Sequence, residues 1–221
     1  RHRALAAELR AWCEEHLTGH HAEVDEACRS HVAKLGEAGW LQHSAAGEGE
    51  RLDVRTLCLI RETIAQYDGL AEFSFAMQGL GMGAVTLFGT AEQRRWLART
   101  RAGHAIAGFA ITEPEAGSDA AAARMTATRV QGGFVLNGEK TYISNGGIAD
   151  VYVVFARTGE APGARGLSAF LVEASTPGLE VAERIDVMAP HPLARLRFTN
   201  VEIPDAALIG KPGEGFKIAM S

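Results

Sequence analysis

The sequence predicts an α+β protein with an N-terminal α-helical domain followed by a β-barrel domain of short, mostly antiparallel strands. Apolar residues recur at helical spacing through the first hundred residues. After residue 104 the pattern changes to short apolar runs separated by Gly, Pro and Asn turn signals. We expect a helical domain over 1–103, a middle β-barrel domain over 104–211 and the start of a further helical domain over 212–221.

Five segments of the first part carry a helical pattern. In the first of them Leu5, Leu9, Trp12, Cys13 and Leu17 recur on one face. The expected helices cover residues 4–17, 24–38, 54–68, 71–89 and 91–101. The fourth contains Gly79, Gly81 and Gly83, each of which weakens helix propensity by about 1 kcal/mol relative to Ala.

The second part reads as strands joined by tight turns. Gln131-Gly132-Gly133 is a hairpin signal, and Asn137-Gly138 indicates another turn. The expected strands cover residues 105–112, 124–130, 134–137, 140–145, 151–157, 167–173, 179–182, 195–198 and 201–203. Residues 216–220 read as the first turn of a helix.

Composition and charge exclude several classes of protein. With 47% hydrophobic and 22% charged residues the chain is an ordinary globular sequence of one or two domains. A net charge of −5 argues against nucleic acid as the main partner. No apolar run of about 18 residues indicates a membrane-spanning helix.

Cysteine and histidine usage point to a reducing compartment and give no metal pattern. Cys13, Cys28 and Cys58 are odd in number and lack metal-ligand spacing, so we expect reduced, mostly buried thiols in the cytoplasm. His20 and His21 follow the first helix without a carboxylate or Cys at ligand spacing, so we expect a solvated loop there. The arginines of 91–101 are expected on a solvated face.

The most informative stretch is Ala107–Asp119, which reads AGFAITEPEAGSD. Its apolar start predicts a buried strand, which Pro114 helps to end. Gly117 allows a close approach of backbone to a ligand. The amides of such a turn, together with the Ser118 hydroxyl, form a concavity for an anion, and Asp119 is a candidate cap for the alanines that follow.

The second informative stretch is Asn137–Gly147, which reads NGEKTYISNGG. Tyr142 and Ser144 should share one face, because side chains alternate along a strand. A tyrosine ring beside a serine hydroxyl suits a flat heteroaromatic ring, by stacking and by donating a hydrogen bond. Taken alone, each motif also fits an ordinary strand that ends in a turn.

In this order, the two stretches resemble the acyl-CoA dehydrogenase family of flavoproteins. TEPEAGSD is similar to the family's flavin signature, and KTYISNG to its second flavin segment, where many members have Trp and Thr at the positions of Tyr142 and Ser144. Residues 87–93, 166–173 and 213–220 are also family-like. The resemblance extends from about Leu35 to the last residue.

The resemblance implies FAD as cofactor and assigns residues to it. Phe109, Ile111 and Thr112 should line the flavin, with Thr112 on its pyrimidine edge. Gly117 and Ser118 should meet the pyrophosphate, and Ser118 should also touch the CoA moiety. The second segment should contribute Tyr142 by stacking, Ile143 beside it, and Ser144 by a hydrogen bond to flavin N5.

The activity that the resemblance implies is α,β-dehydrogenation of an acyl-CoA, with electrons passed to an electron-transfer flavoprotein. The resemblance also implies a homo- or hetero-oligomer, either a dimer or a tetramer. The family's catalytic Glu lies in a C-terminal helical domain outside these residues, so no base is assigned here; Glu113 and Glu115 belong to the flavin signature. Two alternatives stay open: a flavin monooxygenase or oxidase on the same scaffold, and a non-catalytic scaffold subunit.

Two further features have two interpretations each under this resemblance. The glycines of 71–89 allow either close helix packing or room for an acyl chain near the flavin. The segment Met188–Leu193 contains His191-Pro192, where many relatives have a Gly-x-Arg-x-Ser segment. We favour a rigid turn there over a reshaped substrate entrance.

Overall fold

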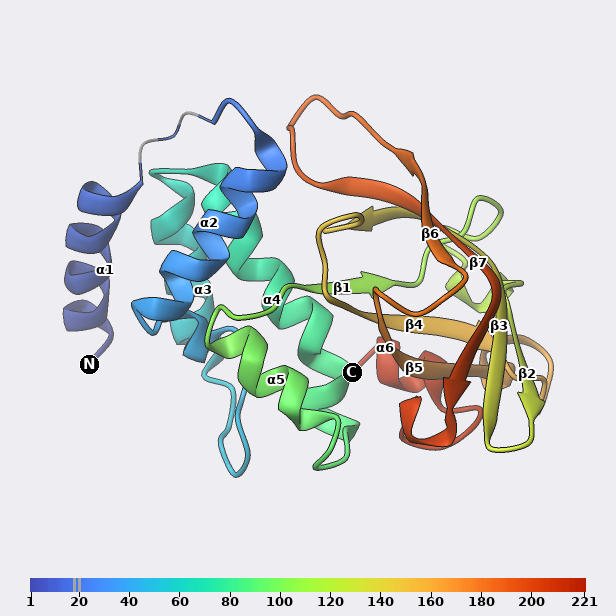
Figure 1. Ribbon diagram of the computed structural model, residues 1–221. Helices are drawn as coiled ribbons and strands as arrows, with labels where there is room; N and C mark the ends of the chain where they lie inside the picture. The colour runs from blue at the N-terminus through green and yellow to red at the C-terminus, as the bar shows by residue number, and fades with distance from the viewer. Residues whose placement is uncertain (18, 20) are drawn as a thin grey trace.

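The computed structural model describes residues 1–17, 19 and 21–221. Its first half consists of helices, which lie on the left of Figure 1. They are α1 (His2–His16), α2 (Val24–Glu37), α3 (Val54–Ala65), α4 (Gly69–Phe88) and α5 (Arg94–Arg101), with a short 3₁₀ turn at Trp40–His43. All five expected helices are present, with ends that differ by up to three residues from the expected ones.

Local hydrogen bonds explain where two of these helices begin. Asp53 caps α3 by accepting from the Thr56 amide at 3.2 Å. Asp68 caps α4, where its Oδ1 accepts from the amides of Leu70 and Ala71 at 2.8 and 3.0 Å. An Asp at this position satisfies amides that the first turn of a helix leaves without partners. The start of α4 is therefore fixed by one carboxylate oxygen of Asp68.

The second half is an eight-stranded, mostly antiparallel sheet that curls around its own core (Figure 1). Its strands are β1 (Ala107–Ala110), β2 (Thr126–Val130), β3 (Gly133–Ser144), β4 (Val151–Arg157), β5 (Leu167–Glu173), β6 (Leu179–Arg184), β7 (Leu193–Pro204) and β8 (Leu208–Ile209). Their order is β6-β7-β3-β2-β4-β5-β8, and β1 pairs in parallel with β4. A last short helix, α6 (Gly215–Ala219), follows where residues 216–220 predicted one.

Two strands are longer than expected. The segments 134–137 and 140–145 were expected as separate strands but form the single 12-residue strand β3, and 195–198 and 201–203 join in the 12-residue strand β7. Register shifts at Leu136/Gly138 and Lys140/Ile143 accommodate the irregular residues. Gly138 has φ 145° and does not turn the chain back, so the expected turn at Asn137-Gly138 is absent and β3 continues through it. The extra residue of this irregularity lies on β7, where Thr199 and Asn200 lie opposite Asn137 alone.

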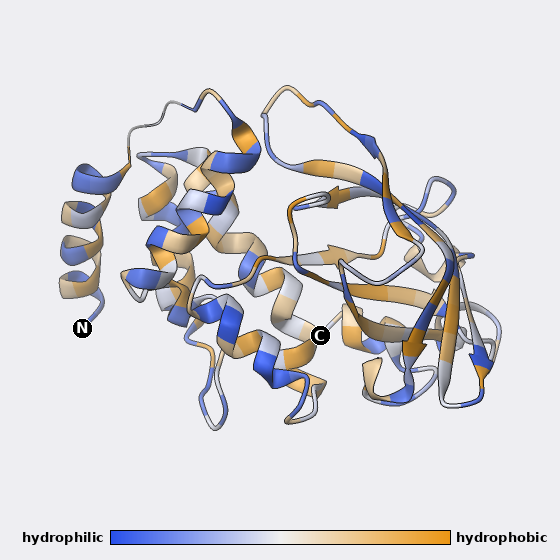
Figure 2. Cartoon of the chain, viewed as in Figure 1, coloured by the Kyte–Doolittle hydropathy of each residue, from blue (hydrophilic) through white to orange (hydrophobic). Residues whose placement is uncertain are grey.

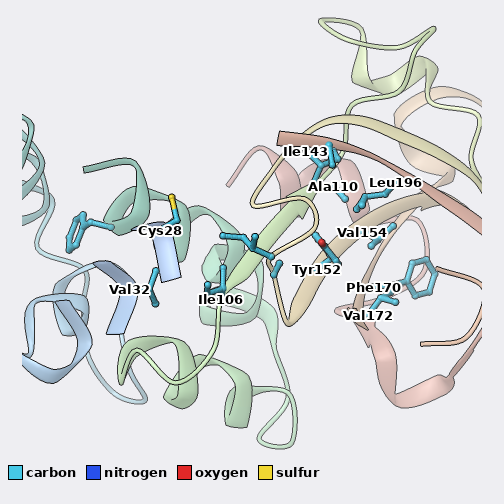
Figure 3. Packing of buried hydrophobic residues seen from close by; sticks show 14 of the residues in the cluster. Cys28, Val32, Ile106, Ala110, Ile143, Tyr152, Val154, Phe170, Val172 and Leu196 are labelled. Carbon is cyan, nitrogen blue, oxygen red and sulfur yellow. The ribbon is translucent and has the colours of Figure 1, made fainter. Parts of the chain in front are cut away.

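Helices and sheet pack against each other through hydrophobic clusters to which both contribute. A continuous buried cluster runs from Cys28 and Val32 on α2 through Ile106 to Tyr152 and Phe170 in the sheet (Figure 3). In Figure 2 the strands β4 and β5 are mostly apolar, whereas apolar and hydrophilic residues alternate along α1 and α2. The division into domains at residue 103 stays a prediction; the structure places that residue in the connection between α5 and β1.

In the described part of the chain, no helix is both long enough and apolar enough to cross a membrane.

Candidate functional site

The two motif stretches lie against each other at the end of β1 and along β3. The Thr141 amide donates to the Thr112 carbonyl at 2.9 Å. The Asn145 side-chain amide reaches the carbonyl of Ala107 at 2.8 Å. Segments separated by about 30 residues in sequence therefore form one continuous surface.

A buried ion pair joins the two motifs at their centre. Lys140 Nζ lies 2.8 Å from Glu113 Oε1 and 3.0 Å from the carbonyl oxygen of Ile111, with the lysine side chain fully buried. Glu113 also accepts from the amides of Arg124 at 2.6 Å and Met125 at 3.0 Å. Burial lowers the pKa of Lys140, and the Glu113 carboxylate opposes that shift. Glu113 is thus the partner that keeps a buried ammonium group charged.

The turn after β1 presents free amide groups. Glu113 and Ala116 exchange backbone hydrogen bonds at 3.0 and 3.1 Å, which closes the turn. Beyond it Gly117 and Ser118 are exposed, and a Cβ added to Gly117 would meet nothing within 4 Å. Within the described residues, the amides of Gly117, Ser118 and Asp119 donate to no acceptor. This arrangement fits an anionic group such as a pyrophosphate.

One expectation for this turn is wrong. Asp119 precedes a 3₁₀ turn at Ala120–Ala122, but its side chain makes no capping hydrogen bond. A turn of three residues has few free amides to cap, so the carboxylate stays exposed.

The second motif holds an aromatic ring away from the core. Tyr142 has φ 54°, a left-handed conformation that is rare for a bulky residue, and its side chain is 63% exposed. Ser144 is half-buried, whereas the side chain of Ile143 is buried in the core. Alternation therefore holds for residues 142–144, as expected, but fails at the bulge, where Lys140 and Thr141 are both buried. The Ile143 side chain is therefore not available to a ligand.

The remaining predicted residues lie at the end of β1. Phe109, Ile111 and Thr112 are half-buried. The ring of Phe109 packs on Phe155 with centroids 4.9 Å apart. Phe109 also lines an apolar groove of about 640 Å³ between α4, the 44–52 loop and α6. The exposed side chains of Leu80 and Leu87 line the same groove.

The glycines of α4 divide between the two interpretations. A Cβ on Gly79 would lie 2.4 Å from the Ser44 carbonyl oxygen, and one on Gly81 would lie 2.6 Å from Ala107 Cβ. These two glycines therefore allow close packing. A Cβ on Gly83 would meet nothing within 4 Å, and Gly83 lines the groove. Only Gly83 leaves room that a ligand could use without displacing protein atoms.

Several residues expected on the surface make defined contacts. His21 is not a solvated loop residue, because its Nε2 lies 2.7 Å from Asp68 Oδ2; His20 lies outside the described residues. Arg101 is mostly buried and pairs with Glu50 at 2.6 Å, unlike the solvated arginine expected there. The His191 ring packs at a tilt against Phe73 of α4, with centroids 4.6 Å apart, so the turn after β6 contacts the helices.

The sequence did not identify Glu113, Lys140 and Asn145 as site-forming residues. The signal for them was present, because each is a polar residue in a motif whose neighbours are buried or in tight turns. Their partners are separated by 27 or more residues, so spacing along the chain does not reveal the pairing.

This fold and motif surface agree with comparisons against known proteins. A family model described as "Acyl-CoA dehydrogenase, N-terminal domain" matches residues 1–104, and "Acyl-CoA dehydrogenase, middle domain" matches residues 108–201. The chain belongs to the acyl-CoA dehydrogenase family.

Individual relatives cover nearly the whole chain. An acyl-CoA dehydrogenase of Bacillus subtilis is 41% identical over 90% of this chain and 54% of its own length. A solved structure described as "Electron transferring flavoprotein of Acidaminococcus fermentans: Towards a mechanism of flavin-based electron bifurcation" is 34% identical, with a TM-score of 0.87 over 99% of this chain and 60% of that one. A solved structure described as "PigA with FAD and proline" is 28% identical, with a TM-score of 0.86 over 99% of this chain and 60% of that one. The chain spans about half the length of the curated relatives it matches.

Proposed function

We propose that this chain binds FAD across the two motif stretches and forms the flavin-holding part of an acyl-CoA dehydrogenase. The observation that carries the proposal is the junction between the motifs. The buried Lys140–Glu113 pair holds the turn at Gly117–Ser118 beside the strand that exposes Tyr142. Free amides, a hydroxyl and an exposed ring on one surface are what a dinucleotide with a flat ring system requires.

Each part of this surface has a separate role in the proposal. The amides of Gly117 to Asp119 and the Ser118 hydroxyl hold the pyrophosphate, whose charge they stabilise. Thr112 and Ser144 present hydroxyl groups to the edge of the flavin ring, and Tyr142 covers one of its faces. FAD held by these residues would supply a hydride acceptor, while the protein would orient the ring and substrate and tune the ring electrostatically.

The substrate in this proposal is an acyl-CoA thioester. The groove beside Phe109 supports it, because its exposed leucines offer an apolar wall to an acyl chain. Electrons then pass to an electron-transfer flavoprotein, and the chain works in a cytoplasmic dimer or tetramer.

No carboxylate of this chain is proposed as the catalytic base. Glu113 is 5% exposed and accepts hydrogen bonds from two amides and Lys140. A base has to reach the substrate proton, and Glu113 is held inside the protein by its partners. Glu113 therefore organises the site and does not take the proton.

One variant tests the flavin assignment. Ser118→Asp introduces a carboxylate at the proposed pyrophosphate site, where repulsion should abolish FAD retention. Ser175→Asp places the same charge on an exposed turn outside the motifs and should retain FAD. Flavin content per chain is measured by absorbance after gel filtration, with circular dichroism as the check on folding. Equal flavin content in the two folded variants would overturn the site assignment.

The alternative is a flavin oxidase or monooxygenase on the same scaffold; one similar structure is described as holding FAD with proline, which is not a CoA thioester. The two functions are separated by the reaction of the reduced flavin with oxygen. Slow reoxidation in air that an electron-transfer flavoprotein accelerates supports the dehydrogenase, and rapid reoxidation in air without that partner supports the alternative.

A further inference from the structure

Three potential metal ligands converge among the helices, away from the two flavin motifs. His21 precedes α2, His31 lies within α2, and Asp68 is the residue before α4. The ligand atoms form a triangle: His21 Nε2 lies 2.7 Å from Asp68 Oδ2 and 3.3 Å from His31 Nε2, and His31 Nε2 lies 3.5 Å from Asp68 Oδ2. Residues from three places in the chain thus direct one donor atom each at a common point.

The three side chains are held in place by the fold. His31 and Asp68 have side chains only 5% and 2% exposed, and that of His21 is 16% exposed. Asp68 Oδ1 is occupied by the cap of α4, which fixes the other oxygen toward the histidines. His31 Nδ1 is buried without a hydrogen-bond partner in the described part of the chain, so the polar contacts of this ring all lie at Nε2.

Hydrogen bonds alone cannot satisfy the triangle. Each of the two Nε2 atoms carries at most one proton, and the carboxylate oxygen carries none when ionised. Two protons can serve at most two of the three contacts, so one pair of polar atoms always faces each other without a bond. A cation at the centre would accept a lone pair from every corner.

The spacing matches a particular class of cation. Bonds of 2.0–2.1 Å from zinc in tetrahedral geometry put neighbouring donor atoms about 3.3–3.4 Å apart. Two of the three edges, at 3.3 and 3.5 Å, agree with this value. The 2.7 Å edge requires only that His21, the most exposed of the three, move slightly away from Asp68. Two imidazoles and one carboxylate are also a ligand set that zinc accepts.

We propose that His21, His31 and Asp68 bind Zn²⁺, with water as the fourth ligand on the side of His21. Because the ligands come from the segment before α2, from α2 and from the start of α4, the ion would clamp these parts together. In this proposal the ion has a bracing role between these segments, separate from the flavin surface, and water fills its open fourth position. Other first-row ions compete for such a site in the Irving–Williams order.

The experiment uses the full chain after treatment with a chelator and dialysis. Zn²⁺ is added in competition with a chromogenic chelator, and bound metal is counted by elemental analysis. We expect one Zn²⁺ per chain and a rise in melting temperature on binding. Asp68→Asn keeps an oxygen that caps α4 but loses the anionic ligand, and His21→Asn removes the most exposed ligand. Both variants should weaken Zn²⁺ binding by at least about 10-fold, because loss of a group that only supports a metal ligand already costs that much.

His104→Asn is the matched control, because His104 is exposed and lies outside the cluster. It should bind Zn²⁺ as the unaltered chain does. Absence of stoichiometric Zn²⁺ binding, or equal affinity in all three folded variants, would overturn the proposal. The second outcome would place any bound zinc at surface histidines elsewhere.

Discussion

Replacement of Lys140 by Met isolates the energetic role of the ion pair between the two motifs. The substitution keeps a long side chain in a fully buried position and removes the charge. Glu113, 5% exposed, then keeps two amide donors but loses its counter-charge. Removal of one partner of a buried pair costs about 3–5 kcal/mol. Since a domain has a stability of about 5–15 kcal/mol, this loss is a large fraction of the total.

Urea unfolding followed by circular dichroism measures the loss. The control is Lys217→Met, which makes the same change in an ion pair with Glu214 at 3.7 Å, where the lysine is 69% exposed. That pair should contribute less than about 1 kcal/mol. If Lys140→Met lowers the free energy of unfolding no more than Lys217→Met does, the reasoning about the buried pair is refuted. A folded Lys140→Met variant should also retain less FAD, because its two motifs are no longer held together.

Two further predictions concern the helices. In α4, Gly83→Ala should raise the free energy of unfolding by up to about 1 kcal/mol through helix propensity. Gly81→Ala should lower it by about 1–3 kcal/mol, because the new Cβ would lie 2.6 Å from Ala107 Cβ. Equal melting temperatures for the two variants would contradict this prediction. Burial raises the pKa of Cys13 from 9.0 to about 11, so the unfolded chain loses this proton first and stability falls from pH 9 to 11 by about 1.4 kcal/mol per pH unit. Urea midpoints at pH 8, 9, 10 and 11 should therefore fall less steeply in Cys13→Ala, and parallel slopes would exclude the thiol as the cause.

The elements of the fold were predictable because their signals are local. Helical spacing identified all five helices, and short apolar runs identified every strand except β8. The sequence did not predict that two pairs of short strands are continuous as β3 and β7. Asn137-Gly138 has the composition of a turn, but pairing of β3 with β7 on both sides keeps it within one strand. Pairing across the sheet outweighed a local turn preference, and a single sequence does not contain that information.

The site was predictable only in part, for a related reason. The motifs placed Gly117, Ser118 and Tyr142 on an accessible surface, and the structure agrees on their exposure. The groups that bring the motifs together come from contacts between distant segments. The same holds for His21, whose partner Asp68 is 47 residues away and serves at the same time as a helix cap. Ligand spacing along the chain cannot reveal such a cluster.

Backbone strain in the second motif points to the same surface. Tyr142 and Asn145 both have positive φ, at 54° and 60°. The backbone strain at Asn145 is offset, because Asn tolerates this conformation. Its backbone amide also donates to the Pro192 carbonyl, and its side-chain amide donates to the Ala107 carbonyl. Tyr142 has an exposed side chain, so burial of its ring does not offset a cost of about 1–3 kcal/mol. A strained residue that gains no packing is explained if its ring has to face a ligand, and this is the position at which the flavin proposal places it.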